Sequence, residues 1–117
     1  AFGTVRLGTH RASGAVRAVK TIRKGEGALT QKAALDAEVA YMKQTDHPNI
    51  VRIYEVFEDA QFMHLAMELC SGGEILEKVI QEVGFTERQA ATVMRQAISA
   101  ICHMHACFIC HRDLKPQ

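Results

Sequence analysis

The chain has 117 residues, of which 14 are Lys or Arg and 13 are Asp or Glu, so its formal net charge is only +1. No run of like charge marks a nucleic-acid-binding arm, and this balance gives no reason to expect a nucleic-acid partner. Hydrophobic residues make up 48% of the chain, which is ordinary for one globular piece with a buried core.

No apolar run approaches the roughly 20 residues needed to cross a bilayer, and residues 1–6 lack the basic-then-apolar pattern of a signal peptide. The sequence therefore predicts a cytoplasmic protein without a membrane partner. The 4 cysteines are interpreted as reduced thiols, because no secretory signal accompanies them. They gather toward one end of the chain: Cys70, Cys102, Cys107 and Cys110.

The first residues have the pattern of a β-hairpin. Val5 and Leu7 alternate with polar neighbours, and residues 11–14 supply turn chemistry before a second strand. One face of that second strand carries a lysine among apolar residues: Val16, Ala18, Lys20 and Ile22.

The middle of the chain predicts one helix and two more strands. Amphipathic spacing favours a helix from near Thr30 to just before Pro48, where proline blocks continuation, and Glu38 lies on this helix. Alternating apolar residues then indicate strands over residues 50–58 and 62–69, joined by a short polar turn.

Two adjacent glycines after residue 71 interrupt this pattern, and only helices are predicted beyond them. The first covers residues 74–82, and a longer one starts at Thr86, whose capping-box partner is Gln89. An apolar stripe from Ala90 to Met104 predicts that one face of the longer helix is buried. Strands with one helix, followed by helices alone, predict an α+β fold in two layers, with a natural ligand site between them.

Four short segments occur in an order that suits phosphoryl transfer, which needs charge neutralisation around phosphates and a positioned base. The terminal segment is the most specific, because it follows a long amphipathic helix and is hard to obtain by chance. The four are Phe2-Gly3-Thr4-Val5, Ala18-Val19-Lys20, Glu68-Leu69-Cys70-Ser71-Gly72-Gly73-Glu74 and His111-Arg112-Asp113-Leu114-Lys115-Pro116. Together these segments resemble the eukaryotic protein-kinase family.

The resemblance covers residues 1–117 and implies a partial kinase domain of the α+β class. Residues 1–69 would form an antiparallel-sheet N-lobe with one helix, and residues 70–73 the hinge. Residues 74–117 would form the first helices of a helical C-lobe that stops within the catalytic loop. The implied activity is ATP-dependent phosphorylation of protein Ser/Thr, since a lysine at position 115 is typical of serine/threonine kinases.

The resemblance also implies an ATP site. Lys20 would contact the α and β phosphates and pair with Glu38, while the backbone at Gly3 would cover the phosphates. Met67 would be the gatekeeper beside the adenine. The remaining assignments are an adenine roof of Val5 and Ala18, base contacts from the backbone of Glu68 and Cys70, and a contact of Glu74 with the ribose or a basic substrate residue.

In the catalytic loop, the resemblance makes Asp113 the acceptor of the substrate hydroxyl proton and Lys115 the cation that steadies the transferring phosphate. Arg112 would pair with a phosphorylated activation loop. The family's Mg²⁺ ligands lie beyond Gln117, and no metal ligand is assigned within the chain. We therefore expect a chain truncated at both ends, without kinase activity on its own and poorly soluble, because its apolar stripe is uncovered.

Within the kinases, residues 46–51, 54–59 and 67–74 are most similar to the calcium-dependent and calmodulin-dependent protein kinases. The implied partners are ATP, a protein substrate and a calcium-sensing module C-terminal to this segment. No EF-hand pattern occurs in these residues themselves.

One position departs from the kinase pattern. Phe108 stands where the family usually has Gly or Asn to leave a helix in the left-handed conformation. A bulky residue in that conformation costs about 1 kcal/mol.

Two other interpretations stay open. A pseudokinase scaffold would keep the fold without the chemistry, although retention of Lys20, Glu38, Asp113 and Lys115 argues against it. The segment Cys107-x-x-Cys110-His111 also matches a haem-attachment motif, and with Cys102, His103 and His105 nearby a zinc site is the other alternative. Covalent haem attachment generally needs an exported or organellar setting, for which no targeting segment is visible.

Overall fold

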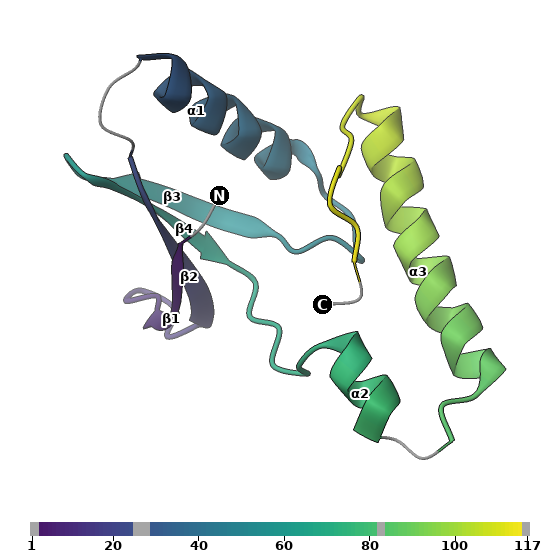
Figure 1. Cartoon of the computed structure of the whole chain (residues 1–117). Helices are drawn as coiled ribbons and strands as arrows, with labels where there is room; N and C mark the ends of the chain where they lie inside the picture. Colours follow the sequence, from purple (N-terminus) through teal and green to yellow (C-terminus); the bar gives the residue numbers. More distant parts are fainter. Residues whose placement is uncertain (1–2, 25–28, 82–83, 116–117) are drawn as a thin grey trace. The chain divides into compact units, whose positions relative to one another are not determined.

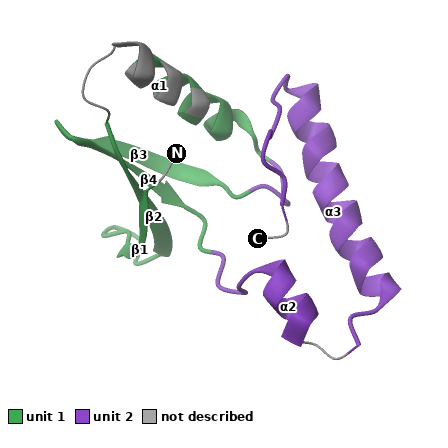
Figure 2. Ribbon diagram, viewed as in Figure 1, with its two compact units in different colours: residues 1–46, 51–69 green, residues 47–50, 70–117 purple. Residues whose placement is uncertain are grey.

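The computed structural model describes residues 3–24, 29–81 and 84–115 and, within helix α1 (Leu29–Gln44), the side chains of residues 33, 36, 37 and 39–44. The chain divides into two compact units, shown in Figure 2. Unit 1 contains Ala1–Asp46 and Val51–Leu69, and unit 2 contains His47–Ile50 and Cys70–Gln117.

Unit 1 is a four-stranded antiparallel sheet with α1 lying along one of its faces (Figure 1). The spatial order of the strands is β1-β2-β4-β3, because the hairpins β1-β2 and β3-β4 are joined through their second strands. The strands are β1 (Thr4–Thr9), β2 (Val16–Arg23), β3 (Ile53–Glu58) and β4 (Phe62–Met67). The α+β class and the antiparallel sheet with one helix, both predicted from the sequence, are confirmed.

The β1-β2 turn is organised by His10. Its backbone N–H donates to the Ala15 carbonyl (2.8 Å), and its own carbonyl accepts from the Gly14 N–H (2.8 Å). Its ring Nδ1 accepts a hydrogen bond from the Ser13 N–H (3.2 Å). The turn predicted over residues 11–14 is therefore present and closed by local hydrogen bonds.

The core of unit 1 lies between the sheet and α1. Because side chains alternate along a strand, Ala18, Lys20 and Ile22 share one face of β2, here called the inner face. Ile22 packs there with Met63 and Leu65 of β4. The buried cluster is Ile22, Val39, Met63 and Leu65, with Val56 and Met67 packed against it. Val39 joins α1 to the sheet, as the amphipathic pattern of that segment predicts.

Both strands of the second hairpin are shorter than predicted. Residues 50–52 precede β3 because the chain turns there, with the Ile50 N–H donating to the His47 carbonyl (3.1 Å). His47 belongs to unit 2, and there it contacts α3 (Glu87–Ala106), with its Nε2 3.1 Å from Ser99 Oγ. The apolar character of residues 50 and 51 therefore gave a wrong boundary for this strand, while β4 ends at Met67 rather than at residue 69.

Unit 2 contains α2 (Ile75–Gln81) and α3. The capping box predicted at the start of α3 is confirmed: the Thr86 side chain accepts from the Gln89 N–H (3.2 Å), and the Gln89 side chain accepts from the Thr86 N–H (2.7 Å). These two bonds satisfy N–H groups that have no partner within the helix.

The end of α3 is a Schellman motif. The Phe108 N–H donates to the His105 carbonyl (3.0 Å), and the Ile109 N–H donates to the Met104 carbonyl (2.9 Å). Phe108 has a φ of 59°, so the left-handed conformation expected at this position is adopted by a bulky residue. Its side chain is 98% exposed and gains no packing in return.

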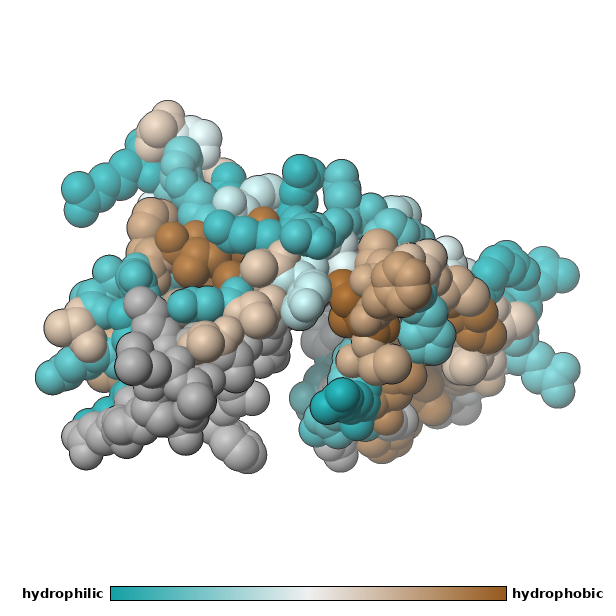
Figure 3. Space-filling view, turned by 90° about the horizontal axis from the view of Figure 1, so that it is seen from above, coloured by the Kyte–Doolittle hydropathy of each residue, from teal (hydrophilic) through white to brown (hydrophobic). Residues whose placement is uncertain are grey.

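The apolar stripe of α3 is only partly covered within unit 2. Ala100 is buried, whereas Met94 and Ile98 are 55% and 52% exposed. The space-filling view shows hydrophobic residues, coloured brown, exposed on the surface of the chain (Figure 3). Within residues 3–24, 29–81 and 84–115, no helix is long and apolar enough to cross a bilayer.

Candidate functional site

Four of the proposed ATP-binding residues lie on the inner face of the sheet in unit 1. Val5 of β1 is paired with Lys20 of β2, and Ala18 of β2 is paired with Met67 of β4. Alternation puts Ala18 and Lys20 on the same side, so these cross-strand neighbours share one face. The register thus brings together residues that are 62 positions apart in the sequence, from Val5 to Met67.

The inner face combines an apolar surface with one cation. Ala18 is buried, with 9% of its surface exposed, while Val5 is 58% exposed. Lys20 is half-buried, and within the described residues it has no hydrogen bond or ion pair. An amino group placed beside apolar strand residues suits an anionic group more than a neutral one.

Glu38 belongs to the backbone of α1 and directly precedes Val39, whose side chain packs in the core of unit 1. The side chain of Glu38 lies outside the described residues. Its pairing with Lys20 stays a prediction.

Gly3 directly precedes β1 and has a structural reason to be glycine. A Cβ at this position would collide with the carbonyl oxygen of Thr21 on the neighbouring strand. Close backbone approach is one of the situations that favour glycine. Phe2, which belongs to the segment predicted to end the glycine-rich loop, lies outside the described residues.

Glu68 follows β4 and has its backbone N–H already engaged. That N–H donates to the Arg52 carbonyl (2.8 Å), and Glu68 Oε2 accepts a hydrogen bond from the Arg52 N–H (3.3 Å). The carbonyl of Glu68, rather than its N–H, is therefore the backbone group suited to contact a base.

The remaining predicted site residues belong to unit 2. Cys70 is exposed and a free thiol, and Glu74 is exposed immediately before α2. Asp113 and Lys115 are two residues apart in the terminal segment, and the lysine Nζ lies 3.2 Å from Asp113 Oδ2. Both side chains are mostly exposed, at 75% for Asp113 and 53% for Lys115, so this ion pair contributes little to stability.

The backbone holds Asp113 in a defined turn. Its N–H donates to the ring Nδ1 of His111 (3.2 Å), and Arg112 between them has a φ of 65°. A left-handed conformation is uncommon for a residue other than glycine. The segment from Phe108 to Asp113 thus contains two such residues within a short distance along the chain.

The cysteine and histidine cluster near the end of α3 does not form a metal site in the described part of the chain. There, no group of three or more His, Cys, Asp or Glu side chains could hold a metal ion. Cys107 Sγ lies 4.0 Å from His103 Nε2, and the His103 ring lies 5.1 Å from that of His47. The zinc interpretation gains no support from this arrangement.

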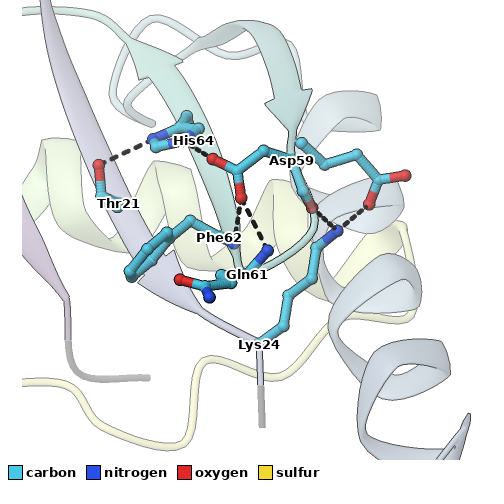
Figure 4. Close-up of polar contacts among 7 residues, drawn as sticks. Thr21, Lys24, Asp59, Gln61, Phe62 and His64 are labelled. Atoms are coloured by element: carbon cyan, nitrogen blue, oxygen red, sulfur yellow. Dashed lines mark hydrogen bonds and ion pairs between the residues drawn. The ribbon is translucent and has the colours of Figure 1, made fainter.

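A polar network on the opposite, outer face of the sheet was missed by sequence reasoning (Figure 4). Asp59, in the β3-β4 turn, accepts hydrogen bonds from the N–H groups of Gln61 (2.8 Å) and Phe62 (2.7 Å). These two bonds, followed by the contact with His64, lower the pKa of the Asp59 carboxyl. An aspartate in a short polar turn is the sequence signal that was available.

Lys24, which directly follows β2, fixes the same turn. Its Nζ donates to the backbone carbonyl of Asp59 (2.6 Å) and lies 2.9 Å from Glu58 Oε2. The turn is therefore tied to the end of the neighbouring strand by one side chain.

Comparison with known proteins gives the family context. A protein kinase domain model matches residues 1–117. A probable myosin light chain kinase of Dictyostelium discoideum is 42% identical over 118 residues, covering 100% of this chain and 37% of that protein. Calcium-dependent protein kinase 5 of Plasmodium falciparum is 40% identical over 116 residues, covering 99% of this chain and 20% of that protein. The chain spans well under half the length of these relatives.

Proposed function

Because the chain belongs to the protein kinase domain family, we propose that the protein containing it transfers the γ-phosphate of ATP to Ser or Thr hydroxyls of protein substrates. The observation that carries the proposal is the cross-strand arrangement on the inner face. Val5 faces Lys20, and Ala18 faces Met67, in the strand register. The relatives at about 40% identity are named as kinases of the calcium-dependent and myosin light chain types.

The residues of unit 1 fit a nucleotide. The small, buried Ala18 leaves room beside Val5 and Met67 for a flat base, and Lys20 supplies a cation for the phosphates on the same face. Glu38 would hold the Lys20 ammonium in place, Gly3 would let the backbone approach the phosphates, and the backbone of residues 68 and 70 would contact the base edge. Glu74 would contact the ribose or a basic substrate residue.

The residues of unit 2 would carry the proton transfer. Asp113 would accept the proton of the substrate hydroxyl as that oxygen attacks the γ-phosphorus. Lys115 already lies beside the Asp113 carboxylate and would neutralise charge that develops on the transferring phosphate. Mg²⁺ would supply further charge neutralisation when bound with ATP, and no residue of this chain is assigned to hold it.

The test uses the full-length protein with radiolabelled ATP and a Ser/Thr peptide library. We expect Lys20→Met and Asp113→Asn each to lower kcat/KM at least about 100-fold, because phosphate binding and general-base catalysis are lost. Lys43→Met, at the exposed end of α1, is the matched control and should keep near wild-type activity. Equal activity of all three variants would refute the assigned roles.

A pseudokinase is the second candidate, and the same assay separates it. A pseudokinase would bind ATP without transferring phosphate. Its background level of phosphate incorporation would therefore be unaffected by Asp113→Asn. We also propose that residues 1–117 alone are inactive, which phosphate transfer by that purified segment would contradict.

Calcium control forms part of the proposal, because relatives such as calcium-dependent protein kinase 5 of Plasmodium falciparum are named as calcium-dependent kinases. We expect the full-length protein to be more active in Ca²⁺ than in EGTA. A cytoplasmic location is also proposed, and it is supported by four free cysteines in the described residues: Cys70, Cys102, Cys107 and Cys110.

A further inference from the structure

The outer face of the sheet in unit 1 contains a hollow of about 460 Å³. Its floor is formed by Val19 and Ala66, and one wall is formed by Phe57. Val19 alternates with Ala18 and Lys20 along β2, so the hollow lies on the opposite side of the sheet from the proposed ATP-binding residues. A ligand in the hollow would therefore not compete directly with a nucleotide.

The hollow exists because small residues lie side by side on this face. Val19 is paired with Ala66 across the β2-β4 ladder, and Gly8 of β1 lies beside them without a side chain. A Cβ at position 8 would lie 2.7 Å from Val19 Cγ2, closer than real Cβ contacts. Replacing Gly8 would both crowd Val19 and reduce the hollow.

The lining offers a flat apolar surface. Phe57 is 55% exposed on this face, although the same strand contributes Val56 to the core. An exposed aromatic ring beside aliphatic floor residues favours an aromatic ligand, since offset stacking adds to the burial of apolar area.

The rim is positively charged. Arg17 is held in position by Tyr54, with its guanidinium carbon 3.7 Å from the ring centroid, and Arg11 lies on the neighbouring turn. Neither arginine has an ion pair with another described residue. The acidic residue at the rim, Glu55, lies 3.8 Å from His10 Nε2. The arginines thus leave a net positive charge at the mouth of the hollow.

We propose that this hollow binds a small planar aromatic carboxylate. Its rings would lie on Val19 and Ala66 beside Phe57, and its carboxylate would receive paired N–H donors from Arg17, supported by Arg11. The volume falls within the range of small-molecule sites. The stacking of Arg17 on Tyr54 lowers the entropy lost when the guanidinium binds an anion.

The test titrates the full-length protein with 2-naphthoate while the nucleotide site is saturated with ATP. Calorimetry should give a Kd of about 1 mM or tighter, as expected for a ligand of this size. In amide NMR spectra the shifted signals should be those of Gly8, Val19 and Ala66. The neutral isostere 2-naphthylmethanol should bind at least about tenfold more weakly, because it cannot accept charge-assisted hydrogen bonds.

Substitutions of the two rim arginines test which of them binds the ligand carboxylate. Arg17→Gln should weaken naphthoate binding at least about tenfold, and Arg11→Gln on the exposed turn should weaken it by a smaller factor. Arg95→Gln on α3 is the matched control and should leave Kd unchanged. If Arg17→Gln fails to fold, the affinity of Arg11→Gln still tests whether the positive rim binds the carboxylate. Absence of binding at millimolar concentration, equal binding of the alcohol, unchanged affinity in both rim variants, or shifts confined to other residues would each overturn the proposal.

Discussion

The carboxylate of Asp59 is held against the ring of His64, with Oδ2 of the aspartate 3.3 Å from Nε2 of the histidine. On its other side, His64 Nδ1 lies 2.9 Å from the Thr21 hydroxyl, so the ring links the β3-β4 turn to β2. Figure 4 shows this chain of contacts together with Lys24. The arrangement makes the turn sensitive to the charge of one carboxyl group.

The first prediction concerns pH. The pKa of Asp59 is lowered from its ordinary value of 3.8, first by the Gln61 N–H and then by the Phe62 N–H and His64. A lowered carboxyl pKa stabilises the fold above the ordinary value, and this contribution is lost as pH falls through the lowered pKa. The urea midpoint should therefore fall between pH 6 and pH 3 by less in Asp59→Asn than in the unmodified protein.

Asp46→Asn is the control for this experiment, since Asp46 is also exposed and lies outside the network. An identical acid-induced change in Asp59→Asn and the unmodified protein would show that the turn contacts do not affect folding.

The second prediction concerns the end of α3. Phe108→Gly should raise the free energy of unfolding by about 1 kcal/mol, because glycine adopts the left-handed conformation without the Cβ penalty. The almost fully exposed ring offers no packing to lose. Thermal unfolding followed by circular dichroism would measure the change. Ala106→Gly, two residues earlier at the last residue of α3, should instead destabilise by up to about 1 kcal/mol.

The third prediction concerns the start of the same helix. Thr86→Ala removes the side-chain acceptor of the capping box and should cost about 1 kcal/mol of stability. Thr92→Ala is a matched control within α3, where the hydroxyl donates to the Arg88 carbonyl (3.0 Å). That change should be neutral or slightly stabilising, since alanine is the better helix former. Equal losses in both variants would argue against the cap.

The fourth prediction concerns the core of unit 1. Leu65→Ala should cost about 2–5 kcal/mol, because Leu65 is 3% exposed and its removal leaves a cavity between the sheet and α1. Leu7→Ala in the same sheet should cost less than about 1 kcal/mol without nucleotide, since this leucine is 72% exposed. Chemical denaturation of both variants would test the assignment of the core.

Local patterns predicted the elements of this fold well where they depend on neighbouring residues. The capping box at Thr86 and the turn before β2 each follow from a few adjacent residues. The left-handed conformation at Phe108 was expected from the kinase resemblance instead. Strand boundaries were not predicted from adjacent residues. Ile50 lies in a turn, where its N–H donates to the His47 carbonyl, and His47 contacts α3, which is distant in the sequence.

The candidate site was predictable only as a set of motifs. The pairing of Val5 with Lys20 depends on the register between β1 and β2, which the sequence suggests through alternation but does not specify. The hollow on the outer face was not predicted, since it depends on Gly8 and Ala66 lying on either side of Val19 on neighbouring strands. Residues so far apart in the sequence leave no local pattern.

The residue at position 8 indicates from the sequence alone whether the hollow is open. Because any side chain at this position would press on Val19, a homologue with a larger residue there must either shift β1 or lose the space. The residue aligned with position 8 therefore sorts homologous chains into those with an open outer face and those with a filled one. An inventory of that single position across genomes would show in which lineages a small ligand has room to bind.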